Sequence, residues 1–404
     1  MVLPSLALSA RRRAVLLLSL GTAASTTPLA AQYGGWLEEM DLTTQLSAAV
    51  TYDSNLLQTD PEIDDVILIG GASAELSREF RFATLSATLS GNVQRFLDYD
   101  VLNNADVFLN WGIDSGETLG NRRFRFQVDF DVQEGSSADL DVRGRVTTRR
   151  YSTGGTLTYR ASAAIEAGLG LRYSKSDPQG GVFRLDPEEG LVETDAAFGN
   201  ETLTYLANLR YIRTARLSFF AQASHSETES ENSARGDSEN QRYSVGVDGQ
   251  ILATLSGRLG AGLQTRSFDG EETTSPYVEG SLNWRINELT GASLSLRRSF
   301  DTSLNGAEAV RNTVSANVNR RLSRRLSAQA GISYNFTEFE FAGNGGDNPE
   351  TRNLQLNAGG SYILTASSAV TATVTWNSLE SDLRSGRNDS SNRLRTMLAY
   401  QYTF

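Results

Sequence analysis

The chain has 404 residues, no cysteine, one histidine and a formal net charge of −11. Without cysteine it has no disulfide framework, zinc ribbon, iron–sulfur cluster or thiol nucleophile, and one histidine gives little basis for a metal centre. The acidic balance argues against a nucleic-acid partner. The mean hydropathy is −0.33, and beyond the N-terminus no apolar run approaches the ~20 residues of a membrane-spanning helix. We therefore expect no metal, no cofactor and no helical membrane domain.

The N-terminus has the layout of an export signal. Three arginines, Arg11 to Arg13, precede a short apolar run at 14–20 and a small-residue region that ends near Ala31. A basic region, a short apolar core and small residues at a cleavage site are typical of a secretory signal peptide. We predict a signal peptide over 1–31 and a single domain over 32–404, because no linker interrupts the later sequence.

From residue 42 onward, apolar and polar side chains alternate. Leu42, Leu46 and Val50 lie at even positions, and the odd positions between them are mostly polar. The same alternation returns at 123–132, 370–377 and 394–404. Side chains of a strand point alternately to opposite faces, so the pattern predicts strands with one apolar and one polar environment.

Segment lengths and connectors favour a membrane barrel over a soluble sandwich. Most alternating segments have about 9–13 residues, close to a tilted membrane-crossing strand and longer than the ~5–6 residues of an average soluble strand. Short turns also alternate with longer polar loops, as in outer-membrane barrels. The short turns are expected near Ser77–Arg81, Ser115–Asn121, Arg160–Ala163, Thr214–Arg216, Ala253–Thr254, Asn287–Thr290, Arg320–Arg325 and Thr365–Ser368. The loops are expected near Ser54–Asp65, Leu97–Leu102, Glu134–Asp141, Lys175–Asp195, Ser226–Asn240, Asp269–Ser275, Asp301–Ala309, Thr337–Thr351 and Leu379–Ser391.

These connectors predict an all-β fold: a transmembrane, antiparallel, up-and-down β-barrel of about 18 strands, with 16 as the alternative. Both termini fall on the short-turn side, which we expect to be periplasmic. In hydrocarbon every backbone polar group must be paired within the protein, and a sheet achieves this by closing on itself. A barrel of this size is wide enough for an aqueous channel.

Aromatic residues are expected in two interface girdles, at the two ends of the strands. The loop-side girdle would hold Tyr52, Tyr173, Phe300, Phe336 and Trp376. The turn-side girdle would hold Tyr159, Tyr211, Trp284, Tyr362 and Phe404.

Charged residues are predicted on the lumen face by the same alternation. The main candidates are Arg123, Arg125, Asp129, Asp131, Arg172, Arg210, Arg258 and Arg297. Opposed charges would create a transverse field that favours polar solutes, or they would only brace the wall through arginine–carboxylate pairs. Both readings stay open, and so does the question of whether the 175–195 loop folds inward and narrows the lumen.

Enzyme chemistry finds little support. His225 lies near the loop end of a strand, but Ser224 and Ser226 point to the opposite face, unlike the serine and histidine of an outer-membrane phospholipase. The acidic residues between Asp60 and Asp65 match no calcium-binding spacing and are expected to be solvated. We expect no catalytic residues and no enzyme activity, with an outer-membrane hydrolase as the weakest alternative.

The C-terminal stretch 398–404 resembles the closing signature of bacterial outer-membrane proteins, with a terminal Phe404 and the aromatic residues Tyr402 and Tyr400 at alternate positions before it. In those proteins the barrel-assembly machinery reads this segment, so the resemblance implies that these three residues are the assembly signal.

The whole layout resembles the outer-membrane β-barrel porins of Gram-negative bacteria, and the segment Val50–Leu56 is similar to one they carry after the first strand. The resemblance implies an outer-membrane channel for passive diffusion of small hydrophilic solutes. An alternative is a barrel associated with exopolysaccharide export. Implied partners are outer-membrane lipid, lipopolysaccharide, the barrel-assembly machinery and small hydrophilic solutes. A homo-oligomer stays an open alternative, because porins are often trimers.

Overall fold

The structure is a computed structural model of the chain. It describes residues 40–404 except 60–61, 117–122, 140–143, 187–189, 195–197, 232–236, 269, 303–307, 341–349 and 383–387. The predicted signal peptide over 1–31 therefore lies outside the described residues.

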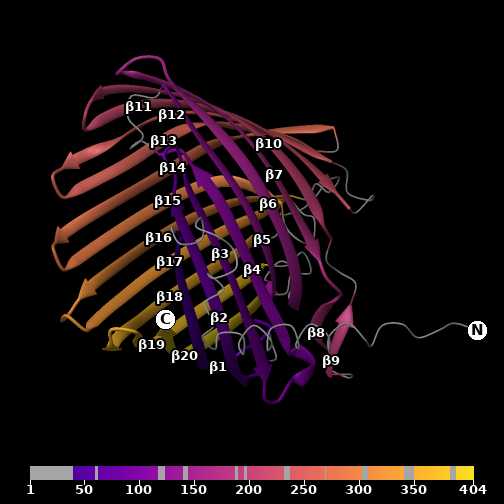
Figure 1. The fold of residues 1–404 in the computed structure, drawn as a ribbon. Coiled ribbons are helices and arrows are strands. Elements are labelled where there is room, and N and C mark those ends of the chain that lie inside the picture. Colours follow the sequence, from indigo (N-terminus) through magenta and orange to yellow (C-terminus); the bar gives the residue numbers. More distant parts are fainter. Residues whose placement is uncertain are drawn as a thin grey trace, which may run out of the picture.

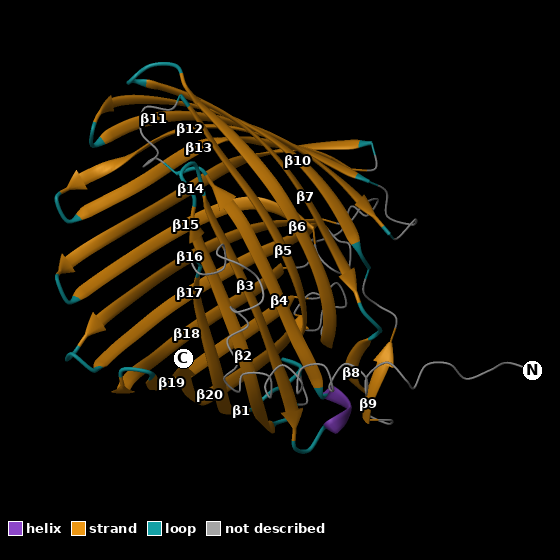
Figure 2. Cartoon of the chain, viewed as in Figure 1, coloured by secondary structure: helices purple, strands orange, loops and turns teal. Residues whose placement is uncertain are grey.

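Strands make up almost all of the described chain (Figure 1). The first ten strands are β1 Asp41–Asp53, β2 Asp65–Glu79, β3 Thr84–Phe96, β4 Asn104–Asp114, β5 Phe124–Asp139, β6 Gly144–Arg160, β7 Ile165–Pro178, β8 Val182–Asp186, β9 Gly190–Thr194 and β10 Asn200–Thr214. The last ten are β11 Leu217–Ser230, β12 Ser238–Leu252, β13 Leu255–Phe268, β14 Glu271–Asn287, β15 Thr290–Thr302, β16 Glu308–Arg321, β17 Leu326–Glu340, β18 Glu350–Thr365, β19 Ser368–Asp382 and β20 Asn388–Thr403. A short 3₁₀ turn at Asp100–Leu102 lies near β8 (Figure 2). Within the described residues, no helix has the length and apolar character to cross a membrane.

The sheet closes on itself. Each wall strand pairs antiparallel with its neighbours, β7 pairs directly with β10, and β1 pairs with both β2 and β20. The β8–β9 hairpin is set apart from this run of strands (Figure 1). Of the twenty strands, eighteen therefore form the wall, and the predicted 18-stranded up-and-down barrel is confirmed.

The alternation predicted from the sequence separates the two faces of the wall. On β1, Leu46 and Val50 are 40% and 49% exposed, whereas Thr51 and Asp53 are fully buried. Large apolar side chains such as Leu169, Val245 and Leu398 are more than half exposed on the same outer face. A barrel whose outer face is apolar suits a hydrocarbon environment, because its backbone groups are paired along every strand.

Several strands extend further toward the loop end than the sequence indicated. The loop predicted over Glu134–Asp141 is largely strand, because β5 continues to Asp139 and β6 begins at Gly144. The loop predicted over Asp269–Ser275 is also mostly strand. Hairpin partners keep pairing beyond the continuous wall, and their sequences there are mostly polar. Because these strand extensions are polar, the sequence analysis predicted them as loops.

The loop end of the β13–β14 hairpin separates from the neighbouring strand β15 at a defined position. β14 pairs with β13 from Glu271 onward, but its pairing with β15 begins only at Val278. Pro276 lies just before this point, and proline has no N–H to donate to a neighbouring strand. The β13–β14 hairpin is thus free of β15 at its loop end.

Candidate functional site

The inner face of the barrel encloses polar cavities. One of about 880 Å³ lies at the turn end, where strands from β12 to β19 contribute to its lining. Eight consecutive strands of a closed wall can border one cavity only from the inside. Its lining includes Gln250, Asn283, Asn319, Gln329 and Thr371, so the space is suited to water and polar solutes.

A second cavity of about 570 Å³ brings together four of the arginines predicted from the sequence. Arg123, Arg125, Arg210 and Arg258 all border it, together with acidic and hydroxyl side chains. All four arginines therefore face one cavity in the structure.

Most of the inner arginines are paired with carboxylates. The Arg172 Nη2–Asp129 Oδ2 distance is 2.9 Å, and the arginine crosses Gly154 on the strand between them. Arg210 Nη2 lies 2.6 Å from Asp248 Oδ1. Charge-assisted contacts of this kind are short and fix both side chains. They are the bracing contacts that the sequence left open as one of two roles.

Asp248 links two of these pairs. Its second carboxylate oxygen lies 3.7 Å from Arg258 Nη1, and Arg258 Nε lies 3.0 Å from Glu279 Oε1. Positive and negative groups thus alternate along the inner wall from β10 to β14. The result is a row of fixed dipoles.

A buried aromatic ring supports this row. Phe220 is 7% exposed, and the guanidinium carbon of Arg258 lies 3.6 Å from its ring centroid. The ring lies over Gly246 and Gly260, where an added Cβ would come within 2.4 and 3.0 Å of Phe220 Cζ. Two glycines therefore make room for a ring that positions Arg258 by stacking. In the sequence, the sign of this arrangement is a glycine at an inner position on each of the two strands that follow β11, which carries the inward-facing Phe220.

The other predicted lumen residues are placed as follows. Arg125 pairs with Asp114 at 3.2 Å. Asp131 accepts a hydrogen bond from the Asn110 side-chain amide. Arg297 lies opposite Glu279 on the adjacent strand.

One stretch of the inner wall, on β17 to β19, is neutral. On β17, inner positions from Ser327 to Asn335 carry serine, glutamine, glycine and asparagine. Their partners on β18, and the β19 residues Thr371, Thr373, Thr375 and Asn377 beyond them, are again hydroxyl, amide or glycine residues. The ion pairs described above lie on β4 to β14, whereas these positions of β17 to β19 offer neutral hydrogen-bonding groups.

A buried apolar cluster lies on the inner face at the loop end. Leu56 and Leu57 of the β1–β2 loop pack against Ile67, Phe96 and Leu102, and all five are at most 3% exposed. Because Leu68, between Ile67 and Ile69, is 41% exposed on the outer face, Ile67 and Ile69 point inward. We call this group the constriction cluster.

The 175–195 segment contributes to the same cluster. Its β8–β9 hairpin places Phe183, Leu185 and Leu191 against the buried leucines, and Phe183 pairs with Arg145 at the start of β6. Folding inward was an open question in the sequence. The apolar side of this hairpin explains the inward position, because it shields Leu56 and Leu57 from water.

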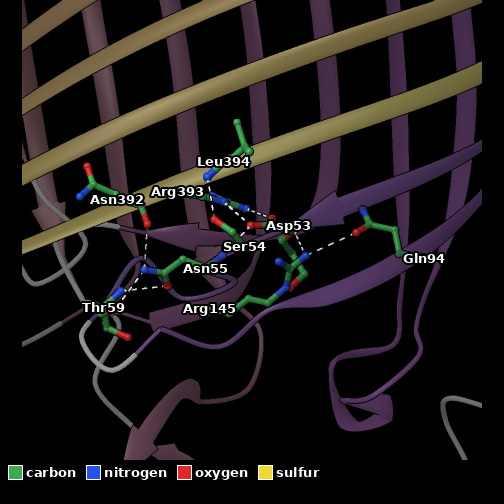
Figure 3. Close-up of polar contacts among 10 residues, drawn as sticks. Asp53, Ser54, Asn55, Thr59, Gln94, Arg145, Asn392, Arg393 and Leu394 are labelled. Atoms are coloured by element: carbon green, nitrogen blue, oxygen red, sulfur yellow. Dashed lines mark hydrogen bonds and ion pairs between the residues drawn. The ribbon is translucent and has the colours of Figure 1, made fainter.

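The segment Val50–Leu56 ties the first strand to the last (Figure 3). Asp53 is fully buried and accepts two hydrogen bonds from Arg393 of β20, one of them at 2.8 Å from Nε. Ser54 exchanges hydrogen bonds with Leu394 through its backbone N–H and its hydroxyl oxygen. The Asn55 amide donates to the carbonyl oxygens of Thr59 and Asn392. This seam cluster fixes the loop end of the closure between β1 and β20.

Arg145 connects the seam cluster to the constriction cluster. It is 5% exposed, it donates to the Ser136 carbonyl oxygen at 2.9 Å and to Gln94 at 3.4 Å, and it lies 4.9 Å from the Phe96 ring centroid. In Figure 3 it points toward Asp53, although β6 and β1 are well separated along the wall. The first residues of β6 therefore lie close to the loop end of β1 on the inner face.

Of the residues considered for other roles, His225 and the C-terminal aromatic residues lie on the outer face. His225 Nε2 is 3.0 Å from Glu227, and its ring stacks with that of Tyr205. Tyr400, Tyr402 and Phe404 are 43%, 38% and 64% exposed, and the rings of the last two meet edge to face. Asp60 lies outside the described residues. The expectation of a solvated side chain is wrong for Asp65, which is buried because it accepts hydrogen bonds from the N–H groups of Leu97, Asp98 and Tyr99. Among the described residues, no group of three or more His, Cys, Asp or Glu side chains is arranged to hold a metal ion.

Comparisons with known proteins place these features in context. The family model described as "Putative beta-barrel porin 2" matches residues 199–402. No curated protein matches the chain. Among solved structures, Pseudomonas aeruginosa OccK1 (OpdK) is 12% identical, with 92% of this chain and 100% of that chain covered and a TM-score of 0.48. P. aeruginosa OpdQ is 9% identical, with 91% and 99% covered and a TM-score of 0.48. Acinetobacter baumannii OccAB4 is 12% identical, with 91% and 98% covered and a TM-score of 0.46.

Proposed function

From the premise that this chain belongs to the β-barrel porin family whose model it matches, we propose that it lets small hydrophilic solutes diffuse passively across the bacterial outer membrane. Membership makes it a porin-like barrel of that membrane. The orientation we propose has both termini and the short turns in the periplasm, and the loops at the cell surface.

The observation that carries this proposal is the polar inner face of a closed barrel. Cavities of about 880 and 570 Å³ are bordered by amide, hydroxyl and charged side chains. A hydrated solute can exchange its water contacts for these groups, whereas an apolar solute finds few partners. The outer face offers the reverse environment and suits lipid.

We assign the selective step to the loop end. There the constriction cluster and the β8–β9 hairpin occupy part of the inner space, with Arg145 beside them. Solute size is limited by these packed side chains. The charge preference at this point is influenced by Arg145 and by the arginines of the seam. Farther along the lumen the arginine–carboxylate pairs orient water without adding net charge.

Export and assembly complete the proposal. The basic and apolar segment over 1–31 is the export signal, and 32–404 is the mature barrel. Tyr400, Tyr402 and Phe404 form the signal for the barrel-assembly machinery, and their exposed outer position on β20 leaves them accessible to a partner before closure.

The two rival functions are less well supported. The family match favours a channel over a barrel dedicated to exopolysaccharide export. A hydrolase would need a nucleophile beside His225, but its ring contacts Tyr205 and Glu227 on the outer face, and Ser226 bonds to Thr204 instead.

Reconstitution into planar bilayers tests the proposal. We expect discrete, steady conductance steps and swelling of vesicles in small sugars, with a cut-off as the sugar grows. A correctly folded barrel, shown by its shift on a gel after boiling, that conducts no ions and passes no sugar would refute the proposed function.

A further inference from the structure

The turn between β16 and β17 concentrates positive charge. Arg320, Arg321, Arg324 and Arg325 fall within six consecutive residues, although the chain as a whole has a net charge of −11. All four side chains are exposed, and Leu322 between them is 53% exposed.

These arginines differ from those of the inner wall. Arg172, Arg210 and Arg258 each have a carboxylate within about 3 Å. In the described part of the chain, none of the four turn arginines forms an ion pair with an acidic side chain. Their positive charge is therefore not neutralised by the protein.

The backbone of the turn is nevertheless well fixed. Leu322 N–H donates to the Leu326 carbonyl oxygen at 2.8 Å. The Ser323 hydroxyl oxygen accepts hydrogen bonds from the N–H groups of Arg325 and Leu326 at 3.2 and 3.0 Å. The arginine side chains thus extend from a defined platform, so that binding a ligand would order only the side chains.

The position of the turn indicates what it meets. Val314 and Val318 are 49% and 44% exposed on the outer face of β16, and Arg320 follows at the next outer position. Trp284 lies in the same hydrogen-bonded row as Val318, two strands away, and is 49% exposed. Aromatic residues at the ends of membrane strands mark the interface, which is where lipid phosphates lie.

We propose that Arg320, at an outer position of β16, and Arg324, in the turn that follows it, bind the phosphodiester head groups of anionic phospholipids in the adjoining leaflet. A guanidinium group matches a phosphate through two parallel hydrogen bonds, and exposed basic residues near a membrane attract anionic lipid. Neighbouring exposed apolar residues, Leu322 and Leu289, suit the upper part of the acyl chains. The site needs only a barrel in a bilayer, so it goes beyond solute passage.

Trp284 provides a local reporter. In a variant with Trp36, Trp111 and Trp376 replaced by phenylalanine, Trp284 is the single tryptophan. Quenching of the Trp284 fluorescence is compared between phosphatidylcholine vesicles that contain brominated phosphatidylglycerol and vesicles that contain brominated phosphatidylcholine. We expect stronger quenching by the anionic lipid, with a preference on the order of fivefold for each arginine engaged. The double variant Arg320→Gln with Arg324→Gln should lose this preference.

A matched control removes two arginines from another turn at the same end. Arg213 and Arg216, near the β10–β11 turn, are also exposed, but four strands separate β11 from β16 within the wall. Their replacement by glutamine changes the net charge equally and should leave quenching of Trp284 unchanged. Equal quenching by both lipids in the parent, or an unchanged preference in the Arg320/Arg324 variant, would overturn the proposal.

Competition distinguishes lipid from free anion. Inorganic phosphate, added against chloride at matched ionic strength, should leave the lipid preference intact. If phosphate abolishes it, the turn binds a soluble anion instead and the lipid assignment is wrong. Conductance is measured on the same variants, so loss of lipid preference with normal channels separates this inference from the proposed function.

Discussion

Removing the charge of Asp53 should open the barrel seam at its loop end. The carboxylate is fully buried and its partner Arg393 is only 12% exposed. In Asp53→Asn the arginine would stay buried with its charge uncompensated. Breaking a buried pair by removing one partner costs about 3–5 kcal/mol, and leaving Asn55 N–H with a weaker acceptor adds to that cost.

The magnitude is measured by reversible unfolding in lipid vesicles, with Asp53→Asn, Arg393→Gln and the double variant forming a thermodynamic cycle. We expect each single substitution to cost about 3 kcal/mol or more and the double variant to cost much less than their sum. The control cycle uses Asp129→Asn and Arg172→Gln, whose side chains are 22% and 52% exposed and whose pair should contribute about 0–1 kcal/mol.

Local opening of the seam, measured by amide hydrogen exchange, gives a second test. The pairing of β1 with β20 ends at Asp53 and Arg395, so amide hydrogen exchange in Asp53→Asn should rise first near these residues. Additive effects of the two substitutions, or single effects no larger than in the control cycle, would refute the assignment of this ion pair as the fastening of the seam.

Three further predictions concern the lumen. Gly246→Ala should destabilise the barrel by about 1–3 kcal/mol, because its Cβ would meet Leu259 O and Phe220. The control Gly70→Ala has no atom within 4 Å to displace. Thermal unfolding of the two variants checks this, and equal effects would contradict it. Leu57→Ala should cost about 2–5 kcal/mol locally and raise the single-channel conductance by loosening the constriction cluster; an unchanged conductance would place the narrowest point elsewhere. Arg145→Gln should shift the reversal potential in a salt gradient toward cations, because a positive charge leaves the narrow end, whereas Lys175→Gln, which removes an outer-face charge beside Glu201, should not.

The wall of the barrel could be predicted from sequence because its physical constraint is local. Alternation at Leu42–Val50 reports two environments across one strand, and the same signal repeats in each wall strand. Arg125, Arg210 and Arg258 occupy polar positions of this alternation, and in the structure they border one cavity. Strand ends were less well predicted, since the loop-end residues of β6, from Gly144 to Thr148, carry no alternating apolar stripe and are buried by contacts with segments distant in the chain.

The narrowed loop end was not predictable in this way. It depends on contacts between segments far apart in the chain, such as Leu56 with Leu185, and a single leucine carries no information about its distant partner. The seam illustrates the same limit. In the sequence, Asp53 stands out only through the resemblance of its segment to one in known porins. Its pairing with Arg393 joins positions 340 residues apart.

The central claim is that alternate side chains face water inside and lipid outside. It is tested most directly by single cysteines along β19, since the chain has none of its own. In vesicles, cysteines at Thr371, Thr373 and Thr375 should react with a charged, water-soluble thiol reagent, and those at Val370, Ala372 and Val374 should be labelled only by a lipid-soluble one. Reactivity without a two-residue period, or with the opposite phase, would contradict the account.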